Sequence, residues 1–157
     1  MFQQRTSRPL NVNFFCHVPP QPDPAREAAW KKRLGAYYAE FGIDPAQIPA
    51  GPGRAPFDEK FCELMLEQKP AVLSFLFGLP EKTLLARARS GGAKIVSSAT
   101  TVAEARWLED QGCDAIIAQG NEAGGHRGIF LSDDLLAQPG TFALVPQVAD
   151  AVKVPVI

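Results

Sequence analysis

Residues 71–118, AVLSFLFGLPEKTLLARARSGGAKIVSSATTVAEARWLEDQGCDAIIA, contain short apolar runs that alternate with helix-like segments. The runs are 71–77 (AVLSFLF), 94–98 (KIVSS) and 114–118 (DAIIA), and the segments between them are 81–90 and 102–111. Near-continuous apolar strands separated by helices are typical of a parallel sheet that is buried on both faces. The strand-to-strand repeat of roughly 20 residues is short for a doubly wound fold and favours a (β/α)8 barrel.

The same alternation is expected on both sides of this stretch. On the N-terminal side, Asp23 and Pro24 supply an N-cap and a first helical position, and Gly42 supplies a stop. The aromatic residues between them are expected to pack in the core or against other helices; they are Trp30, Tyr37 and Tyr38. The outer segments give expected strands at 11–17 and 154–157, helices at 25–41, 58–68 and 142–152, and a Pro/Gly-rich loop at 43–56. On the helix at 58–68, Phe61, Leu64 and Met65 are expected to share one face.

Five expected strands are fewer than the eight of a complete barrel, which typically needs about 250 residues. The fold class is therefore α/β, a partial (β/α)8 TIM barrel that supplies about strands 3 to 7 of the full barrel. Residues 1–157 are expected to form one incomplete barrel domain, without the first strands and the C-terminal phosphate-binding strands. The chain is then an internal piece of a longer barrel or a truncated product. Its open strand edges predict association into a homo-oligomer.

Composition excludes several classes of function. The chain is 46% hydrophobic, carries a net charge of −1, and has no Lys/Arg cluster with interleaved aromatics, so nucleic-acid binding is not expected. No apolar run approaches the roughly 18 residues of a membrane span, and MFQQRTSRPL contains no secretory h-region. The three cysteines are widely spaced and form no CxxC, which predicts a reduced cytoplasmic protein with neither a disulfide framework nor a metal site.

The richest stretch chemically is 118–128, AQGNEAGGHRG, directly after the run that ends at Ala118. In a barrel, catalytic groups lie at the C-terminal ends of the strands, which is where this stretch falls. Its glycines allow backbone N–H groups to form an anion-binding concavity, and His126 can exchange a proton near neutral pH. The alternative interpretation is that these glycines form a sharp turn and have no role in binding.

This stretch closely resembles the signature of the nitronate monooxygenase family, formerly called 2-nitropropane dioxygenases. The resemblance extends to NVNFF at 11–15 and to KIVSSATT at 94–101, in the family's order. It implies an FMN-dependent (β/α)8 flavoprotein, a monooxygenase-type oxidoreductase. Such an enzyme oxidises small alkyl nitronates, or nitroalkanes, with dioxygen to a carbonyl compound and nitrite.

The resemblance also implies roles for individual residues. His126 corresponds to the catalytic histidine, which takes the α-proton of a nitroalkane or helps to hold the anionic nitronate. Asn13, from the VN motif, and the signature residues Gln119, Gly120, Gly124 and Gly125 correspond to FMN-binding positions. No metal is implied.

Other residues and other functions remain open from sequence. Glu122 and Arg127 are expected to brace the loop or face solvent, and His17 is expected to pack or to orient a neighbour. Either Ser97 or Ser98 is a candidate to line a cofactor pocket. A related barrel, the flavin-dependent enoyl-acyl-carrier-protein reductase, has a similar EAGGH run and is the enzymatic alternative. A non-catalytic remnant of a barrel is the alternative from another class.

Overall fold

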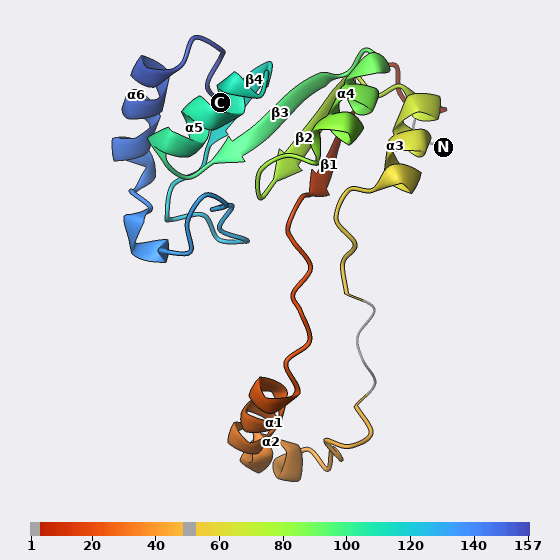
Figure 1. Cartoon of the computed structure of the whole chain (residues 1–157), viewed down its shortest axis with the longest axis vertical. Coiled ribbons are helices and arrows are strands. Elements are labelled where there is room, and N and C mark those ends of the chain that lie inside the picture. Colours follow the sequence, from red (N-terminus) through yellow and green to blue (C-terminus); the bar gives the residue numbers. More distant parts are fainter. Residues whose placement is uncertain (1–3, 49–52) are drawn as a thin grey trace. The chain divides into compact units, whose positions relative to one another are not determined.

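The computed structural model describes residues 4–48 and 53–157, which divide into two compact units. One unit comprises Met1–His17 together with Ala55–Ile157, and the other comprises Val18–Arg54. Figure 1 shows the elements of both units along the chain. In the described part of the chain, no helix is both long and apolar enough to cross a membrane.

The first unit is built on a parallel sheet with the strand order β1-β2-β3-β4. Its strands are β1 (Asn11–Phe15), β2 (Val72–Leu76), β3 (Lys94–Ala99) and β4 (Ala115–Ala118). Beyond β4 the C-terminal residues continue the sheet, because the Ile116 N–H donates to the Pro155 carbonyl and the Ile157 N–H donates to the Ile116 carbonyl. The strand expected at 154–157 is thus present only as an isolated parallel bridge between Ile116 and Val156.

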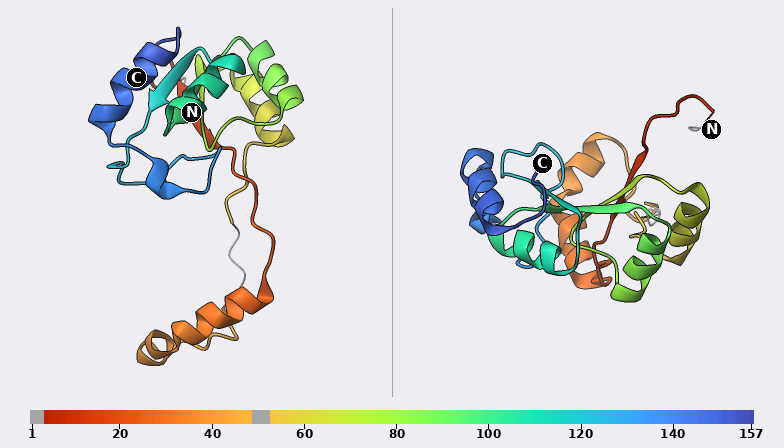
Figure 2. Two further views of the ribbon diagram at one scale, coloured as in Figure 1. Left: turned by 60° about the vertical axis from the view of Figure 1, so that its left-hand side comes forward. Right: turned by 90° about the horizontal axis from the view of Figure 1, so that it is seen from above.

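The helices confirm the alternating pattern. They are α3 (Glu59–Gln68), α4 (Lys82–Ser90), α5 (Val102–Asp110) and α6 (Thr141–Ala151), and a short 3-10 helix at Leu135–Ala137 was not expected from sequence. Each new strand adds on the same side of the preceding one, so right-handed crossovers place the connecting helices on one face of the sheet. Figure 2 shows α4 and α5 on the same side of the strands. This is the progression of a barrel, with no reversal of strand order such as a doubly wound sheet requires.

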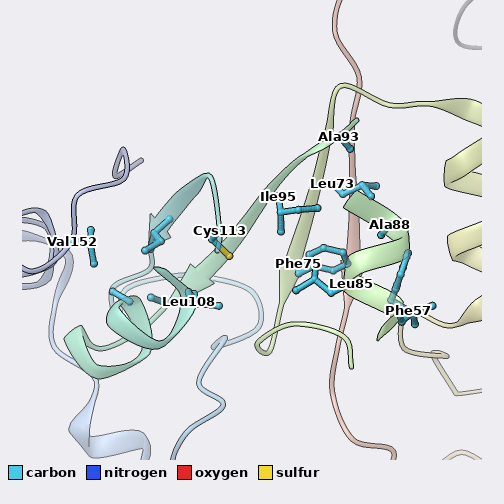
Figure 3. Packing of buried hydrophobic residues seen from close by; sticks show 14 of the residues in the cluster. Phe57, Leu73, Phe75, Leu85, Ala88, Ala93, Ile95, Leu108, Cys113 and Val152 are labelled. Carbon is cyan, nitrogen blue, oxygen red and sulfur yellow. The ribbon is translucent and has the colours of Figure 1, made fainter. Parts of the chain in front are cut away.

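The hydrophobic core lies between this face of the sheet and the helices (Figure 3). Alternate strand residues point into it, and the register places Phe14, Phe75 and Ser97 side by side on this face. The largest fully buried apolar side chains from the strands and helices are Leu73, Phe75, Ile95, Leu108, Ile116, Leu144 and Val148. The opposite face carries Asn13 beside Ser74 and corresponds to the interior of a barrel.

One detail of the helix pattern was wrong. Thr101 caps α5, and Gly112 follows that helix with a positive φ of 86°, as expected. On α3, however, Leu64 is 44% exposed, while Cys62 and Met65 are buried. The core-facing stripe of α3 therefore runs through Cys62 instead of Leu64, because a small apolar thiol fits against α4, where its Sγ lies 3.9 Å from the Leu84 carbonyl oxygen.

The second unit contains α1 (Pro24–Arg33) and α2 (Gly35–Glu40). Asp23 caps α1 by accepting from the Arg26 N–H, as expected. The single helix expected at 25–41 is interrupted at Leu34, whose ψ of 2° departs from helical geometry ahead of Gly35, a poor helix former. Neither helix buries a residue.

The expectation that Trp30, Tyr37 and Tyr38 pack in the core or against other helices was wrong for the first two, whereas Tyr38 is half-buried. Within this unit Trp30 is 57% exposed and Tyr37 is 60% exposed. Helical spacing places such rings on one face, but a unit this small has no second apolar layer to cover that face.

Candidate functional site

Four aromatic rings meet at the carboxyl ends of β1 and β2. The His126 ring contacts Phe15, with centroids 5.0 Å apart, and Phe77, with centroids 6.0 Å apart, in edge-to-face geometry. His17 contacts the same two rings, at 6.2 Å and 6.3 Å. Phe77 directly follows β2 with a positive φ of 67°, which is unusual for a bulky residue and marks a backbone constrained by its surroundings. The predicted catalytic histidine therefore lies against the ends of strands far from it in sequence.

Gln119 holds the loop that carries His126. Its Nε2 donates to the His126 carbonyl over 3.0 Å, and its Oε1 accepts from the Gly128 N–H over 2.6 Å. Gln119 immediately follows β4, so the side chain ties the loop back to the sheet. One hydrogen of Nε2 remains for a further acceptor. The structure thus shows a bracing role for this residue, beside the flavin contact that the resemblance implies.

Glu122 joins the loop to the N-terminus of α6. Its carboxylate accepts from the Thr141 N–H over 2.8 Å and from Thr141 Oγ1 over 2.9 Å. These hydrogen bonds from Thr141 lower the pKa of Glu122, because they stabilise the charged form. The helix cap residue, Gly140, has no side chain with which to cap, and Glu122 performs that function from a distance. The expectation that Glu122 braces the loop is confirmed.

The glycines of the signature differ in how much space surrounds the position that a Cβ would occupy. A Cβ on Gly120 would lie 2.5 Å from Glu122 Oε2 and closer still to the N and Oγ1 of Thr141, so only glycine fits there. A Cβ on Gly128 would lie 2.7 Å from Leu76 Cδ1. Gly124 and Gly125 face open space instead.

The exposed part of the loop offers unused donors. Among the described residues, no acceptor is found for the backbone N–H groups of Gly124, Gly125 and His126. Three successive N–H groups with open space around them are suited to the oxygens of an anion or of a flavin ring. The residues present therefore fit a flavin at this position.

Polar residues also lie on the opposite face of the sheet. Asn13 is exposed, and its Oδ1 accepts from Ser74 Oγ over 2.9 Å, which leaves its amide nitrogen available as a donor. Ser98 lies on the same face. Ser97 points the other way, into the core, where its hydroxyl donates to the carbonyls of Phe75 and Gly78. Of the two serines, Ser98 is the one on the side where a barrel encloses its ligand.

Sequence reasoning missed Glu104, a carboxylate that is 1% exposed. Its Oε2 accepts from the N–H and the hydroxyl of Thr100, and its Oε1 accepts from the N–H groups of Phe130 and Leu131. The available signal was the T-x-x-E spacing of Thr101 and Glu104, which is typical of a capping box. In the described ranges, no group of His, Cys, Asp and Glu side chains is arranged to hold a metal ion.

Comparison with known proteins identifies relatives over nearly the whole chain. Residues 2–157 match the family model described as nitronate monooxygenase. The chain is 42% identical over 154 residues to the nitronate monooxygenase of Pseudomonas aeruginosa, covering 97% of this chain and 44% of that protein. It is 40% identical over 153 residues to the nitronate monooxygenase of Paraburkholderia phytofirmans, covering 97% and 42%.

Solved structures agree with these relatives. Nitroalkane oxidase from Streptomyces ansochromogenes superposes with a TM-score of 0.79 at 34% identity, covering 98% of this chain and 44% of that one. FabK from Thermotoga maritima superposes with a TM-score of 0.58 at 23% identity, covering 98% and 34%, and shows a shared fold alone. The chain spans less than half the length of the curated relatives named above. Its four parallel strands are part of a TIM barrel, and the chain belongs to the nitronate monooxygenase family.

Proposed function

We propose that this chain provides the catalytic histidine and one wall of the flavin site of an FMN-dependent enzyme. The reaction is oxidation of alkyl nitronates, and of nitroalkanes, with dioxygen to a carbonyl compound and nitrite. Membership of the family implies a flavin, and FMN is the form proposed. The observation that carries the proposal is the position of His126, which is held on the signature loop against Phe15 and Phe77.

The proposed FMN contacts come from two parts of the first unit. Asn13 offers its amide nitrogen from β1, and Gln119 offers the second hydrogen of its Nε2. Gly124 and Gly125 offer backbone N–H groups for which the described residues supply no acceptor. Gly120 contributes indirectly, because its lack of a side chain allows Glu122 and Thr141 to meet and thereby shape the loop.

The chemistry assigned to this chain's own residues is proton transfer and binding of an anion. The His126 imidazole accepts the α-proton of a neutral nitroalkane through its unprotonated ring nitrogen, as a general base. A preformed nitronate has already lost this proton. A bound flavin would accept electrons from the nitronate and pass them to dioxygen.

The first test is a visible absorption spectrum of the 157-residue chain after incubation with FMN and desalting. A retained flavin band supports the proposed cofactor site in this chain. Loss of the band would show that these 157 residues do not retain FMN without the phosphate-binding strands, and it would contradict a cofactor site formed by this chain alone. Oxygen uptake is then measured with a small nitroalkane and with its preformed nitronate.

His126→Asn is expected to reduce turnover of the nitroalkane by on the order of 10²–10⁴-fold, and turnover of the nitronate by much less. His17→Asn is the matched control, because His17 contacts the same two phenylalanine rings and no catalytic role is proposed for it. Equal loss with both substrates in the His126 variant would refute the role of base.

The enoyl-acyl-carrier-protein reductase alternative predicts a different set of reactants. That reaction requires a nicotinamide donor and an enoyl thioester, so NADH oxidation that depends on an enoyl thioester would favour it. The identities of 40% and 42% to proteins named nitronate monooxygenase support the nitronate reaction.

A further inference from the structure

The carboxylate of Glu104 links two segments of the chain, one at Thr100 and the other at Phe130 and Leu131. One oxygen accepts both hydrogen bonds from Thr100, at the carboxyl end of β3, each over 2.7 Å. The other accepts from the Phe130 N–H over 2.7 Å and from the Leu131 N–H over 3.2 Å. Residues 130–131 follow the signature loop, so Glu104 fixes the far end of the segment that carries His126.

No cation accompanies this carboxylate among the described residues, and it is 1% exposed. A buried charge is tolerated only when its hydrogen-bonding capacity is met, and here four donors meet it. Removing this acceptor would leave buried N–H groups at both loops without a partner. The carboxylate therefore constrains the two loops jointly, and neither can move away at low cost.

The segment at 130 also packs against the sheet and α5. The Phe130 ring contacts Trp107, with centroids 5.2 Å apart. The ring also lies close to Gly78, because a Cβ added to Gly78 would be 3.1 Å from Phe130 Cδ2. Two residues earlier, the Gly128 N–H bonds to Gln119. The segment with His126 is consequently held at residues 126 and 128 by Gln119 and at residues 130–131 by Glu104.

We propose that Glu104 is a positioning residue: its buried carboxylate seats residues 130–131 and thereby holds His126 at the ends of the strands. The catalytic role of this placement rests on the proposed function, whereas the placement itself does not. The placement itself is tested by amide hydrogen exchange, without cofactor or substrate.

Glu104→Asp is the decisive variant. The shortened side chain keeps its charge and stays within reach of the neighbouring turn at Thr100, but it withdraws from Phe130 and Leu131. The exchange rates of these two amides are expected to rise by on the order of tenfold or more, because each loses a bond to a charged acceptor. The amides of β3 are expected to keep their protection.

Glu104→Gln tests rescue by a conservative change. Only the Thr100 hydroxyl can accept from the new amide NH2, so the remaining oxygen is expected to stay with Phe130 and Leu131. Protection at these residues should then remain within about threefold of the parent. If the aspartate variant does not fold, this variant decides: the Thr100 amide, which then faces a donor, should lose protection, and unchanged protection at both Thr100 and 130–131 would overturn the proposal.

The same helix offers a matched control. Glu109, also on α5, accepts through Oε1 from the N–H groups of Lys153 and Val154, over 2.6 Å and 3.1 Å. Glu109→Asp is expected to speed exchange at 153–154 and to leave 130–131 unchanged. The chain has two tryptophans, so in a Trp30→Phe background the emission of Trp107 reports on Phe130. A red shift is expected with Glu104→Asp and none with Glu109→Asp.

Unchanged exchange at 130–131 in Glu104→Asp would overturn the proposal, as would equal acceleration of the β3 amides, which would show a role in global stability instead. If the chain also turns over nitroalkane, Glu104→Asp should lower kcat and leave KM nearly unchanged. A protein with the expected exchange pattern but no activity towards any nitronate would contradict the proposed function and leave the placement of the loop standing.

Discussion

Gly120→Ala is expected to destabilise the protein through one steric clash. Gly120 is buried at the start of the signature loop, and an added Cβ would lie 2.5 Å from Glu122 Oε2 and closer still to Thr141. One of the Thr141 atoms in its way is a backbone nitrogen at the start of α6, which cannot rotate aside as a side chain can. Either α6 must shift or the Glu122–Thr141 hydrogen bonds must break.

The expected change in the free energy of unfolding is the sum of two opposing effects. Overpacking by a methyl group that the surroundings cannot accommodate costs up to about 3 kcal/mol. Alanine also restricts the unfolded chain, which returns about 0.4–1 kcal/mol. The free energy of unfolding should therefore fall by about 2 kcal/mol. Gly124→Ala is the control: its Cβ meets nothing within 4 Å, so it should gain the unfolded-state benefit of about 0.4–1 kcal/mol without the clash.

The assay is urea denaturation of the parent and both variants, followed by far-ultraviolet circular dichroism. With a slope of about 2 kcal/mol per molar urea, the midpoint of Gly120→Ala should lie about 1 M below that of the parent. The midpoint of Gly124→Ala should lie at or slightly above it. Equal midpoints for the two alanine variants would refute the steric reasoning.

Other predictions concern caps, charge and thiol reactivity. Thr101→Ala should lower the free energy of unfolding by about 1 kcal/mol, measured in the same urea assay, because the side chain caps α5. Partial burial raises the pKa of Asp114, but hydrogen bonds from the Ile95 N–H and Lys94 outweigh it and hold that pKa below its usual 3.8. A carboxyl with a lowered pKa stabilises the fold above its usual pKa and loses this contribution as the pH falls through the folded value. Asp114→Asn should therefore lower the thermal midpoint at pH 7, and the difference from the parent should close as the pH falls below 3.8; a constant difference would contradict it. Burial raises the pKa of the Cys113 thiol to about 12, so iodoacetamide at pH 8 should label Cys113 only after unfolding, as mass spectrometry can show.

Much of the fold followed from the period of the apolar residues. The strands at 71–77, 94–98 and 114–118 and the helices between them formed within a few residues of their expected bounds. These runs are typical of buried strands because they are short and bounded by glycine or proline, and the longer segments between them repeat at helical spacing. The sequence did not predict which face of each strand points toward the helices. A strand buried on both sides does not reveal which side faces the helices, so the sequence could not separate Ser97 from Ser98.

The errors lie where tertiary context outweighs local pattern. The helical spacing of Trp30, Tyr37 and Tyr38 predicts packing in a core or against another helix, but the segment forms two short helices with no buried residue. A helical period shows which residues share a face and says nothing about whether another layer covers that face.

The candidate site was also predictable from sequence only in part. The signature 118–128 and its position after a strand predicted His126 at the barrel's catalytic end, and the structure places that ring against Phe15 and Phe77. The bracing role of Gln119, the steric need for Gly120 and the buried contacts of Glu104 depend on residues that lie far apart in sequence.

By itself, the sequence determined the alternation of strands and helices, the family resemblance and the residue types available for chemistry. Those properties depend on short stretches, in which neighbouring residues share one periodicity or one motif. Only the tertiary structure decided which glycine must remain glycine and which carboxylate holds the His126 loop. The physical reason is that such roles arise from distances between segments, as between Glu104 and Phe130, and each chain segment taken alone is compatible with many arrangements of the others.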